Sequence, residues 1–283
     1  MRRSRPTNDV STFGNGFKKY MEVIIQPTYA RLTEVAAEII RDALLEKPNL
    51  VLGLATGSTP IGVYEALVRM HKTDRLDFSG VTTFNLDEYV GIPSDHPYSY
   101  HTFMAVHLFD AVNIPAENRH IPQSTVVGLE EFCERYEAAI VAAGGIDIQV
   151  LGIGKDGHIG FNEPSSSLGS RTRIKTLTQS TLEANAPHFG GTLDAVPKMA
   201  ITMGVGTIME ARQCLLLASG KSKAEAIAHA VEGSITAEVP ASVLQMHPRT
   251  VVVIDEAAAS QLKRVDYYKQ VYSNKQKLLS QKH

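Results

Sequence analysis

Short, continuously apolar runs alternate along the chain with longer stretches in which apolar residues recur at helical spacing. In the stretch 29–48, for example, Leu32, Val35 and Ile39 fall on one face of a helix, and Pro48 follows its end. The pattern predicts strands at 21–27, 49–55, 81–89, 146–154, 198–204, 213–219 and 250–255, and helices at 29–48, 61–72, 98–112, 129–145, 207–212 and 221–233.

The repeated strand-then-helix order predicts an α/β fold. Strands that are apolar throughout are typical of a mostly parallel sheet with helices on both faces. In such sheets, ligands bind at the carboxyl ends of the strands. We therefore expect three unusual segments at the ends of strands or directly after them, at 56–60, 87–88 and 152–164, to converge on one site.

The two ends of the chain depart from this pattern. Residues 1–20 hold five basic residues and several turn formers, but no apolar core of the kind that a secretory signal needs. We interpret 1–20 as a disordered extension, 21–272 as a single domain, and the polar residues 273–283 as a frayed tail.

Composition and charge exclude several classes of protein. Of 283 residues, 28 are Lys or Arg and 30 are Asp or Glu, which gives a formal net charge of −2. A hydrophobic share of 43% with 20% charged residues excludes disorder along the whole chain. The near-neutral balance gives no general attraction to nucleic acid or to an anionic membrane, and no apolar run is long enough to cross one.

The two cysteines, Cys133 and Cys214, have a spacing that fits neither a disulfide framework nor a zinc site. We expect both to be core residues. Free thiols and the missing secretory signal together predict a cytoplasmic location.

The loop Thr56-Gly57-Ser58-Thr59-Pro60 lies between a predicted strand and a predicted helix, which is the arrangement of an anion site. Gly57 lets the backbone turn tightly, and the hydroxyls of Ser58 and Thr59 add donors. The spacing is neither that of a Walker A loop nor that of a dinucleotide fingerprint. The alternative is a capped helix that simply follows a strand.

A second basic loop, 219–223, also lies between a strand and a helix. Lysines in a first helical turn oppose the helix dipole, so Lys221 and Lys223 favour an anionic ligand nearby. A solvated lysine pair is the alternative.

Asp87 and Glu88 stand at the end of a predicted strand. Adjacent side chains on a strand point to opposite faces, so only one of the two can face a site. A carboxylate at a strand's carboxyl end is placed for general-base work. A surface or capping role is the alternative.

The loop 152–164 is the most informative stretch, because titratable residues stand in a glycine-rich backbone. A carboxylate beside His158 can fix its tautomer and raise its basicity, which makes His158 a candidate proton shuttle near neutral pH. A metal site fits less well, because the loop offers no second histidine. The glycines are Gly152, Gly154, Gly157 and Gly160, and the titratable residues are Asp156, His158 and Glu163.

The segments LGLATGSTP, TTFNLDEYVG, LGIGKDGHIGFNEP and AITMGVGTIMEA stand in the order found in glucosamine-6-phosphate deaminases. From Val51 to about Asp255, the chain resembles this family of glucosamine/galactosamine-6-phosphate isomerases. The resemblance implies a Rossmann-like α/β fold and one catalytic domain. It also implies the conversion of glucosamine 6-phosphate and water to fructose 6-phosphate and ammonia, with no metal or organic cofactor.

The resemblance further implies roles for individual residues. His158, oriented by Asp156 and Glu163, would open the sugar ring. Asp87, as a carboxylate, would take the C2 proton of the open-chain sugar and return it at C1, through an enolamine. The implied substrate-binding residues are Thr56, Gly57, Ser58, Thr59, Gly152, Gly160 and Lys223.

One position departs from the family's pattern. Members carry an arginine that contacts the phosphate, and Pro187 stands at that position here. Proline cannot replace the bidentate contacts of a guanidinium. We expect a raised KM with the chemistry retained; a weak substitution by His188 or a different substrate are the alternatives.

Ser166, Ser167, Arg173 and Lys175 match the residues with which hexameric members bind N-acetylglucosamine 6-phosphate between subunits. The resemblance therefore implies a homo-oligomer with an N-acetylglucosamine 6-phosphate effector. A basic strand on a lid segment is the alternative.

Three other functions compete with this interpretation. Two are enzymes, a galactosamine-6-phosphate deaminase and a 6-phosphogluconolactonase-like enzyme, and NLDEYVG together with GHIGFNEP favours the glucosamine enzyme over both. The third is a non-catalytic sugar-phosphate sensor. Such sensors usually accompany a DNA-binding module, but the 20-residue arm is too short for a helix-turn-helix domain. Retention of Asp87 and His158 also favours catalysis. We expect a small-molecule amino-sugar phosphate as the partner, and neither nucleic acid nor a membrane.

Overall fold

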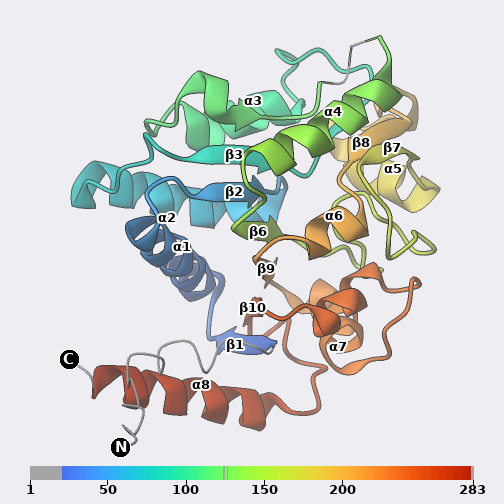
Figure 1. Cartoon of the computed structure of the whole chain (residues 1–283). Helices are drawn as coiled ribbons and strands as arrows, with labels where there is room; N and C mark the ends of the chain where they lie inside the picture. The colour runs from blue at the N-terminus through green and yellow to red at the C-terminus, as the bar shows by residue number, and fades with distance from the viewer. Residues whose placement is uncertain (1–20, 124, 126, 282–283) are drawn as a thin grey trace, which may run out of the picture.

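The computed structural model describes residues 21–123, 125 and 127–281, with all their side chains except those of Ala184 and His188. The predicted extension 1–20 lies outside the described residues. A sheet of seven parallel strands forms the centre, in the order β1-β10-β9-β6-β2-β3-β5 (Figure 1). Its strands are β1 (Glu22–Gln26), β2 (Val51–Leu54), β3 (Thr82–Asn85), β5 (Arg119–His120), β6 (Ile148–Leu151), β9 (Gln213–Ala218) and β10 (Thr250–Asp255).

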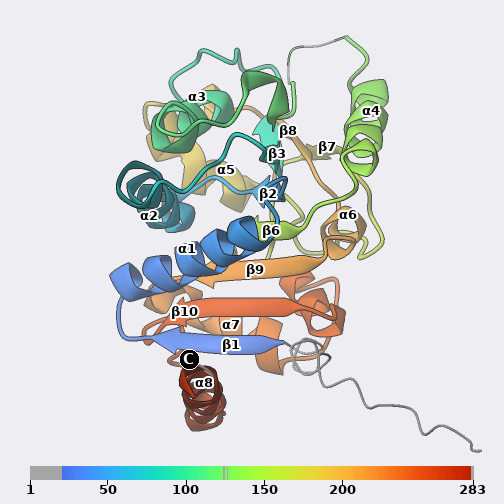
Figure 2. The same ribbon diagram turned by 60° about the vertical axis from the view of Figure 1, so that its left-hand side comes forward.

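Helices cover both faces of this sheet. The first three, α1 to α3, lie on one face, and α4, α6 and α7 lie on the other (Figure 2). α8 packs along the edge strand β1. This arrangement confirms the predicted α/β fold. The helices are α1 (Tyr29–Glu46), α2 (Ser58–Asp74), α3 (Tyr100–Met104), α4 (Leu129–Ala142), α5 (Gln179–Asn185), α6 (Val205–Met209), α7 (Ala224–Glu232) and α8 (Val265–Ser280).

Shorter turns complete the backbone. One is a π-helical continuation of α3, and the others are 3₁₀ turns. They are η2 (Ala105–Phe109), η3 (Ala116–Asn118), η4 (Ala186–Phe189), η5 (Leu193–Ala195), η6 (Lys221–Lys223) and η7 (Pro240–Met246).

The first helix shows how the apolar pattern produces this layering. Thr28 caps α1, since its side chain accepts a hydrogen bond from the Arg31 N–H. Leu32, Val35 and Ile40 are then buried against the sheet. Burial of each such side chain stabilises the fold by about 1.5–3 kcal/mol.

A second, three-stranded antiparallel sheet corrects the predicted strand map. It contains β4 (Asp87–Tyr89), β8 (Met199–Thr202) and β7 (Arg173–Thr176), in that order. The single strand predicted at 81–89 is therefore two strands in two sheets, broken at Leu86. Both halves are buried, so the apolar pattern gives no sign of the change of partner.

The tail prediction is also wrong for residues 273–280, because α8 continues through them to Ser280. Polar composition suggested fraying, but long-range contacts hold the helix in place. The Lys275 ammonium lies 2.8 and 2.6 Å from the two carboxylate oxygens of Glu22 on β1. Tyr272 packs against the main core.

Both cysteines are buried with free thiols, Cys133 on α4 and Cys214 on β9, which confirms their predicted place in the core. Among the described helices, none has both the length and the apolarity needed to span a membrane.

Candidate active site

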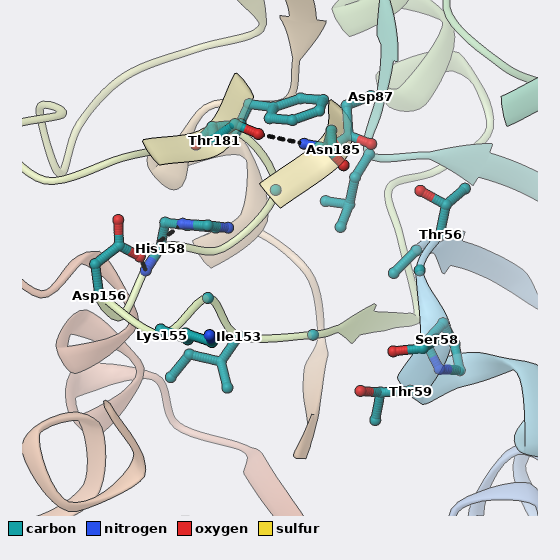
Figure 3. Close-up of a pocket in the computed structure, with 18 of the residues that line it drawn as sticks. Thr56, Ser58, Thr59, Asp87, Ile153, Lys155, Asp156, His158, Thr181 and Asn185 are labelled. Atoms are coloured by element: carbon teal, nitrogen blue, oxygen red, sulfur yellow. Dashed lines mark hydrogen bonds and ion pairs between the residues drawn. The ribbon is translucent and has the colours of Figure 1, made fainter. Parts of the chain in front are cut away.

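A cavity of about 750 Å³ opens at the carboxyl ends of the central strands (Figure 3). The predicted loops meet there: the segment after β2, the junction of β3 and β4, and the loop after β6. The helix α5 and the loop before α7 complete the wall. The lining includes Thr56, Gly57, Ser58, Thr59, Asp87, Gly152, Asp156, His158, Gly160 and Lys223, which are all but one of the predicted catalytic and substrate-binding residues.

The amino end of α2 forms one side of the cavity. Gly57 precedes the helix with a φ of 108°, a conformation that favours glycine. No side chain caps the helix there, and its first turn holds no acidic residue. The first-turn N–H groups can therefore bind an anion, and Ser58 and Thr59 lie beside them.

Two lysines bring positive charge to the cavity. Lys223 donates from Nζ to the Ile153 carbonyl oxygen at 2.6 Å, which holds it against the loop after β6. Burial, followed by the charge of Lys155, lowers the pKa of Lys223, and Asp156 opposes this shift. Within the described lining, Lys155 and Lys223 are the only lysines, and no arginine is present. Sequence reasoning missed Lys155, although its place inside the glycine-rich loop was a usable signal.

Asp87 is a buried acid on β4, with 6% of its surface exposed. Burial, and secondly the charge of Glu88, raise the pKa of Asp87 to about 8. In the free protein most of Asp87 is thus protonated at pH 7, whereas the implied role needs a carboxylate. Gly160 leaves room for this acid, because a Cβ there would lie 3.2 Å from Asp87 Oδ2 and 2.9 Å from Thr202 Oγ1.

Glu88 points away from the cavity and anchors α3 instead. Its Oε2 accepts hydrogen bonds from the N–H groups of Tyr100 at 2.8 Å and His101 at 3.2 Å. Its Oε1 accepts the Tyr89 N–H at 2.9 Å. The structure therefore confirms that only one of the two adjacent acids faces the site.

His158 and Asp156 form a pair on the wall opposite Ser58 and Thr59 (Figure 3). His158 Nδ1 lies 2.7 Å from Asp156 Oδ1. The hydrogen bond with His158 is the largest of the effects that lower the pKa of Asp156. A carboxylate at Nδ1 leaves Nε2 as the nitrogen able to accept a proton. Gly154 provides the space, because a Cβ there would lie 2.2 Å from the imidazole ring.

Glu163, the fourth predicted catalytic residue, does not line the cavity. It is 1% exposed, and its Oε1 accepts hydrogen bonds from Thr178 N at 3.0 Å, Thr178 Oγ1 at 2.7 Å and Thr181 Oγ1 at 2.5 Å. Thr178 is the N-cap of α5. The structure thus joins Glu163 to α5, which forms part of the cavity wall, and its described hydrogen bonds go to Thr178 and Thr181 and not to His158.

Several lining residues escaped the sequence interpretation. Thr178 is a typical N-cap residue, so the sequence contains a sign that a helix starts there. The pattern of apolar residues, however, does not indicate that α5 faces the site. Tyr100 becomes a wall residue through the turn that Glu88 holds. The missed polar residues are Tyr100, Lys155, Ser180, Thr181, Glu183 and Asn185.

The four residues predicted for an effector lie outside the cavity lining. Arg173 and Lys175 stand two apart on β7, so they share a face of that strand. Arg173 Nη1 donates to Asn162 Oδ1 at 2.9 Å. Ser166 is buried, while Ser167 is exposed.

Pro187 lies exposed in η4, two residues after Asn185 of the cavity wall. The alternative that His188 weakly replaces the family's arginine lies outside the described residues, because the side chain of His188 is not among them. Across the described residues, no group of three His, Cys, Asp or Glu side chains is arranged to hold a metal ion.

Comparison with known proteins agrees with this geometry. The sequence profile described as glucosamine-6-phosphate isomerases/6-phosphogluconolactonase matches residues 26–253. The glucosamine-6-phosphate deaminase of Thermoanaerobacter pseudethanolicus is 52% identical over 240 residues, which cover 85% of this chain and 94% of that protein. The deaminase of Shewanella loihica is 52% identical over 258 residues, covering 91% and 96%.

Solved structures give the same result. A structure described as a monomeric glucosamine-6-phosphate deaminase superposes with a TM-score of 0.83 at 48% identity, covering 85% of this chain and all of that one. The 6-phosphogluconolactonase of Thermotoga maritima superposes with a TM-score of 0.66 at 22% identity, covering 83% and 100%, and shows the fold alone. The chain therefore belongs to the family of glucosamine-6-phosphate isomerases and 6-phosphogluconolactonases, and within it to the glucosamine-6-phosphate deaminases.

Proposed function

We propose that this protein is an enzyme that converts glucosamine 6-phosphate and water to fructose 6-phosphate and ammonia. One observation carries the proposal: a buried acid, a histidine–carboxylate pair and an anion site line the same cavity. About 50% identity to proteins named glucosamine-6-phosphate deaminase supports this substrate and reaction.

The phosphate group binds at the amino end of α2. Thr56, Gly57, Ser58 and Thr59 supply backbone and hydroxyl donors, and Lys223 supplies a charge. Lys155 adds a second positive charge from the loop after β6. Gly152 and Gly160 let the sugar approach the backbone between the phosphate site and Asp87.

His158 opens the pyranose ring. With Asp156 at Nδ1, its Nε2 accepts the proton of the anomeric hydroxyl and delivers a proton to the ring oxygen as the C1–O5 bond breaks. The product of this step is an open-chain aldehyde. Glu163 contributes indirectly, because it holds the first turn of α5 against the cavity.

Asp87 carries out the proton transfer between carbons. Its carboxylate takes the C2 proton of the aldehyde while the C2 ammonium gives a proton to the carbonyl oxygen O1, which forms an enolamine. Asp87 then returns its proton at C1 to form an iminium at C2. Water adds to the iminium, and ammonia leaves to give the ketose. A positioned base of this kind accelerates such a step by roughly 10²–10⁴-fold.

The raised pKa of Asp87 fits this role once substrate is bound. An ammonium group on C2 places a positive charge beside the carboxyl and favours its ionised form. Binding of the amino sugar therefore prepares its own base. A substrate without the amino group lacks this effect, which links the acid to amino-sugar chemistry.

A panel of substrates tests the proposed function. Turnover of glucosamine 6-phosphate, galactosamine 6-phosphate and 6-phosphogluconolactone is compared by kcat/KM, with ammonia as the readout for the two amino sugars. The proposal expects the highest kcat/KM for glucosamine 6-phosphate. Hydrolysis of the lactone without ammonia release from either amino sugar would overturn it.

We also propose that Ser166, Ser167, Arg173 and Lys175 bind N-acetylglucosamine 6-phosphate as an effector, in a homo-oligomer. The resemblance supports both ideas, whereas the similar structure at 48% identity is described as monomeric. The effector is titrated into the assay of the full-length enzyme, alongside an Arg173→Ala variant. A shift of the substrate curve that the variant loses supports the site, and an unchanged curve removes it.

Two further predictions belong to the same proposal. The single catalytic domain predicted for residues 21–272 extends to Ser280, because α8 packs on β1. The free thiols of Cys133 and Cys214 support the predicted cytoplasmic location.

A further inference from the structure

Asp255 is a buried acid that the mechanism above does not use. It ends β10, next to β9 in the sheet, and has 7% of its surface exposed. It does not line the cavity. Burial of a carboxylate costs free energy unless hydrogen bonds compensate it, so its partners indicate why it is there.

The partners of Asp255 are concentrated in the turn that joins β9 to α7. Its Oδ2 accepts the Ser219 hydroxyl at 2.5 Å and the Gly220 N–H at 3.0 Å. Its Oδ1 lies 3.1 Å from the same Gly220 nitrogen and accepts the Ala258 N–H at 2.7 Å. One side chain therefore ties the turn after β9 to the chain after β10.

The turn held in this way leads directly to Lys223. Gly220 has a φ of 89°, which places it in the left-handed region that favours glycine. Its carbonyl oxygen accepts the Lys223 N–H at 3.1 Å, inside η6. Asp255 thus holds Gly220, whose carbonyl oxygen accepts the backbone N–H of Lys223. At the other end of the Lys223 side chain, the ammonium donates to the Ile153 carbonyl oxygen.

We propose that Asp255 is a positioning residue for the phosphate end of the substrate, which acts by holding the Ser219–Gly220 turn so that Lys223 reaches the cavity. Its own negative charge repels a phosphate, so its contribution is geometric and not electrostatic. The inference rests on the proposed function, because that function assigns the phosphate to Lys223 and the amino end of α2.

Asp147 provides a matched control, since it is also a nearly buried acid, 8% exposed, that accepts a backbone N–H. It precedes β6 at the opposite end of the sheet. Asp255→Asn and Asp147→Asn are each compared with the wild-type chain. The expected result is a rise of about tenfold in KM for glucosamine 6-phosphate in Asp255→Asn, with kcat within about threefold of wild type. Asp147→Asn is expected to leave both constants unchanged.

Binding of inorganic phosphate, measured by calorimetry, separates this inference from the proposed function. The phosphate Kd is expected to rise in Asp255→Asn and to stay at the wild-type value in Asp147→Asn. Absence of glucosamine 6-phosphate turnover in the wild-type chain would overturn the proposed function and leave this phosphate comparison intact. Equal phosphate Kd values in Asp255→Asn and wild type would overturn the inference.

Ser219→Ala is the milder variant if Asp255→Asn does not fold. It removes one hydrogen bond to Asp255 and leaves the two Gly220 contacts in place. A rise of about threefold in KM and in the phosphate Kd is expected, with a fall of only about 2–4 °C in the thermal midpoint. Unchanged KM and Kd values in this variant would contradict the positioning role.

Discussion

Two buried acids, Asp147 before β6 and Asp87 after β3, stand at opposite ends of the strands and have opposite surroundings. At the amino end, Asp147 accepts the Val51 N–H at 2.8 Å and pairs with Lys47 at 2.6 Å and Arg212 at 3.0 Å. At the carboxyl end, Asp87 has a like charge, Glu88, as its neighbour, and burial raises its pKa to about 8. The first acid is compensated by cations, and the second is destabilised in its charged form.

Together with the proposed role of Asp87, this difference relates stability at one end of the strands to reactivity at the other. An acid that accepts hydrogen bonds from a backbone N–H and from two cations holds neighbouring segments together. An acid whose charged form is disfavoured by burial lowers the stability of the fold. It can exchange a proton readily when a positively charged group binds beside it. The fold thus places the ion-paired Asp147 and the buried Asp87 at opposite ends of the strands.

The strongest test of the carboxyl end is removal of the imidazole. His158→Gln keeps a polar side chain but cannot relay a proton, so kcat/KM for glucosamine 6-phosphate should fall by roughly 10²–10⁴-fold. Steady-state kinetics measures the loss. The control is His229→Gln, which changes an exposed histidine of α7 away from the cavity and should keep wild-type kinetics. Comparable losses in the two variants would contradict the role of His158.

The second test uses the pH dependence of stability at Asp87. Between the pKa of the unfolded chain, about 3.9, and the folded value of about 8, the folded protein holds a proton that the unfolded chain has released. Stability must therefore fall as pH rises through this window, by about 1.4 kcal/mol per pH unit from this group. Asp87→Asn has no such proton, so its free energy of unfolding should rise relative to wild type from pH 5 to pH 8.

Denaturant unfolding of both proteins at four pH values measures this difference. Comparison between variant and wild type cancels the titration of the other acids. If the difference in free energy of unfolding between Asp87→Asn and wild type stays constant from pH 5 to pH 8, the pKa of Asp87 is not raised in the folded protein. The proposed contrast between Asp87 and Asp147 would then be wrong.

The third test addresses the amino end. Asp147→Ala leaves the Val51 N–H without its acceptor and separates two cations from their shared partner. The free energy of unfolding should fall by about 2–3 kcal/mol, while KM and kcat stay within about twofold of wild type. Loss of activity in a folded Asp147→Ala protein would show that the two ends are coupled.

The smallest expected effect concerns the phosphate site. Pro187→Arg adds a guanidinium beside the cavity wall, and its bidentate contacts with phosphate should lower KM about three- to tenfold. kcat should not change, because the proton transfers lie elsewhere. Thr192→Arg, an exposed position in the same segment, is the control for added charge. An unchanged KM in Pro187→Arg would remove the explanation offered for Pro187.

The layout of the main sheet was predictable from sequence, because buried parallel strands are apolar throughout. The runs at 49–55 and 146–154 became β2 and β6, and the loops after them reached the cavity as expected. The opposite orientation of Asp87 and Glu88 followed from strand geometry alone. These features depend on local pattern and on one general rule of sheet topology.

Other features depend on tertiary contacts that local pattern does not contain. The break at Leu86 arises because β4 pairs with β8 from a distant part of the chain. Glu163 turns to Thr178, and α8 is held by Lys275 against Glu22, through contacts between residues far apart in sequence. The pKa of Asp87 depends on how deeply the small sheet buries it. None of these could be read from the order of residues.

The most direct test of the account is the release of both products from glucosamine 6-phosphate by three proteins: wild type, Asp87→Asn and Asp147→Asn. Wild type and Asp147→Asn should release equal amounts of ammonia and fructose 6-phosphate, and Asp87→Asn should release neither. Release of both products by Asp87→Asn at the wild-type rate would contradict the assignment of the reactive acid.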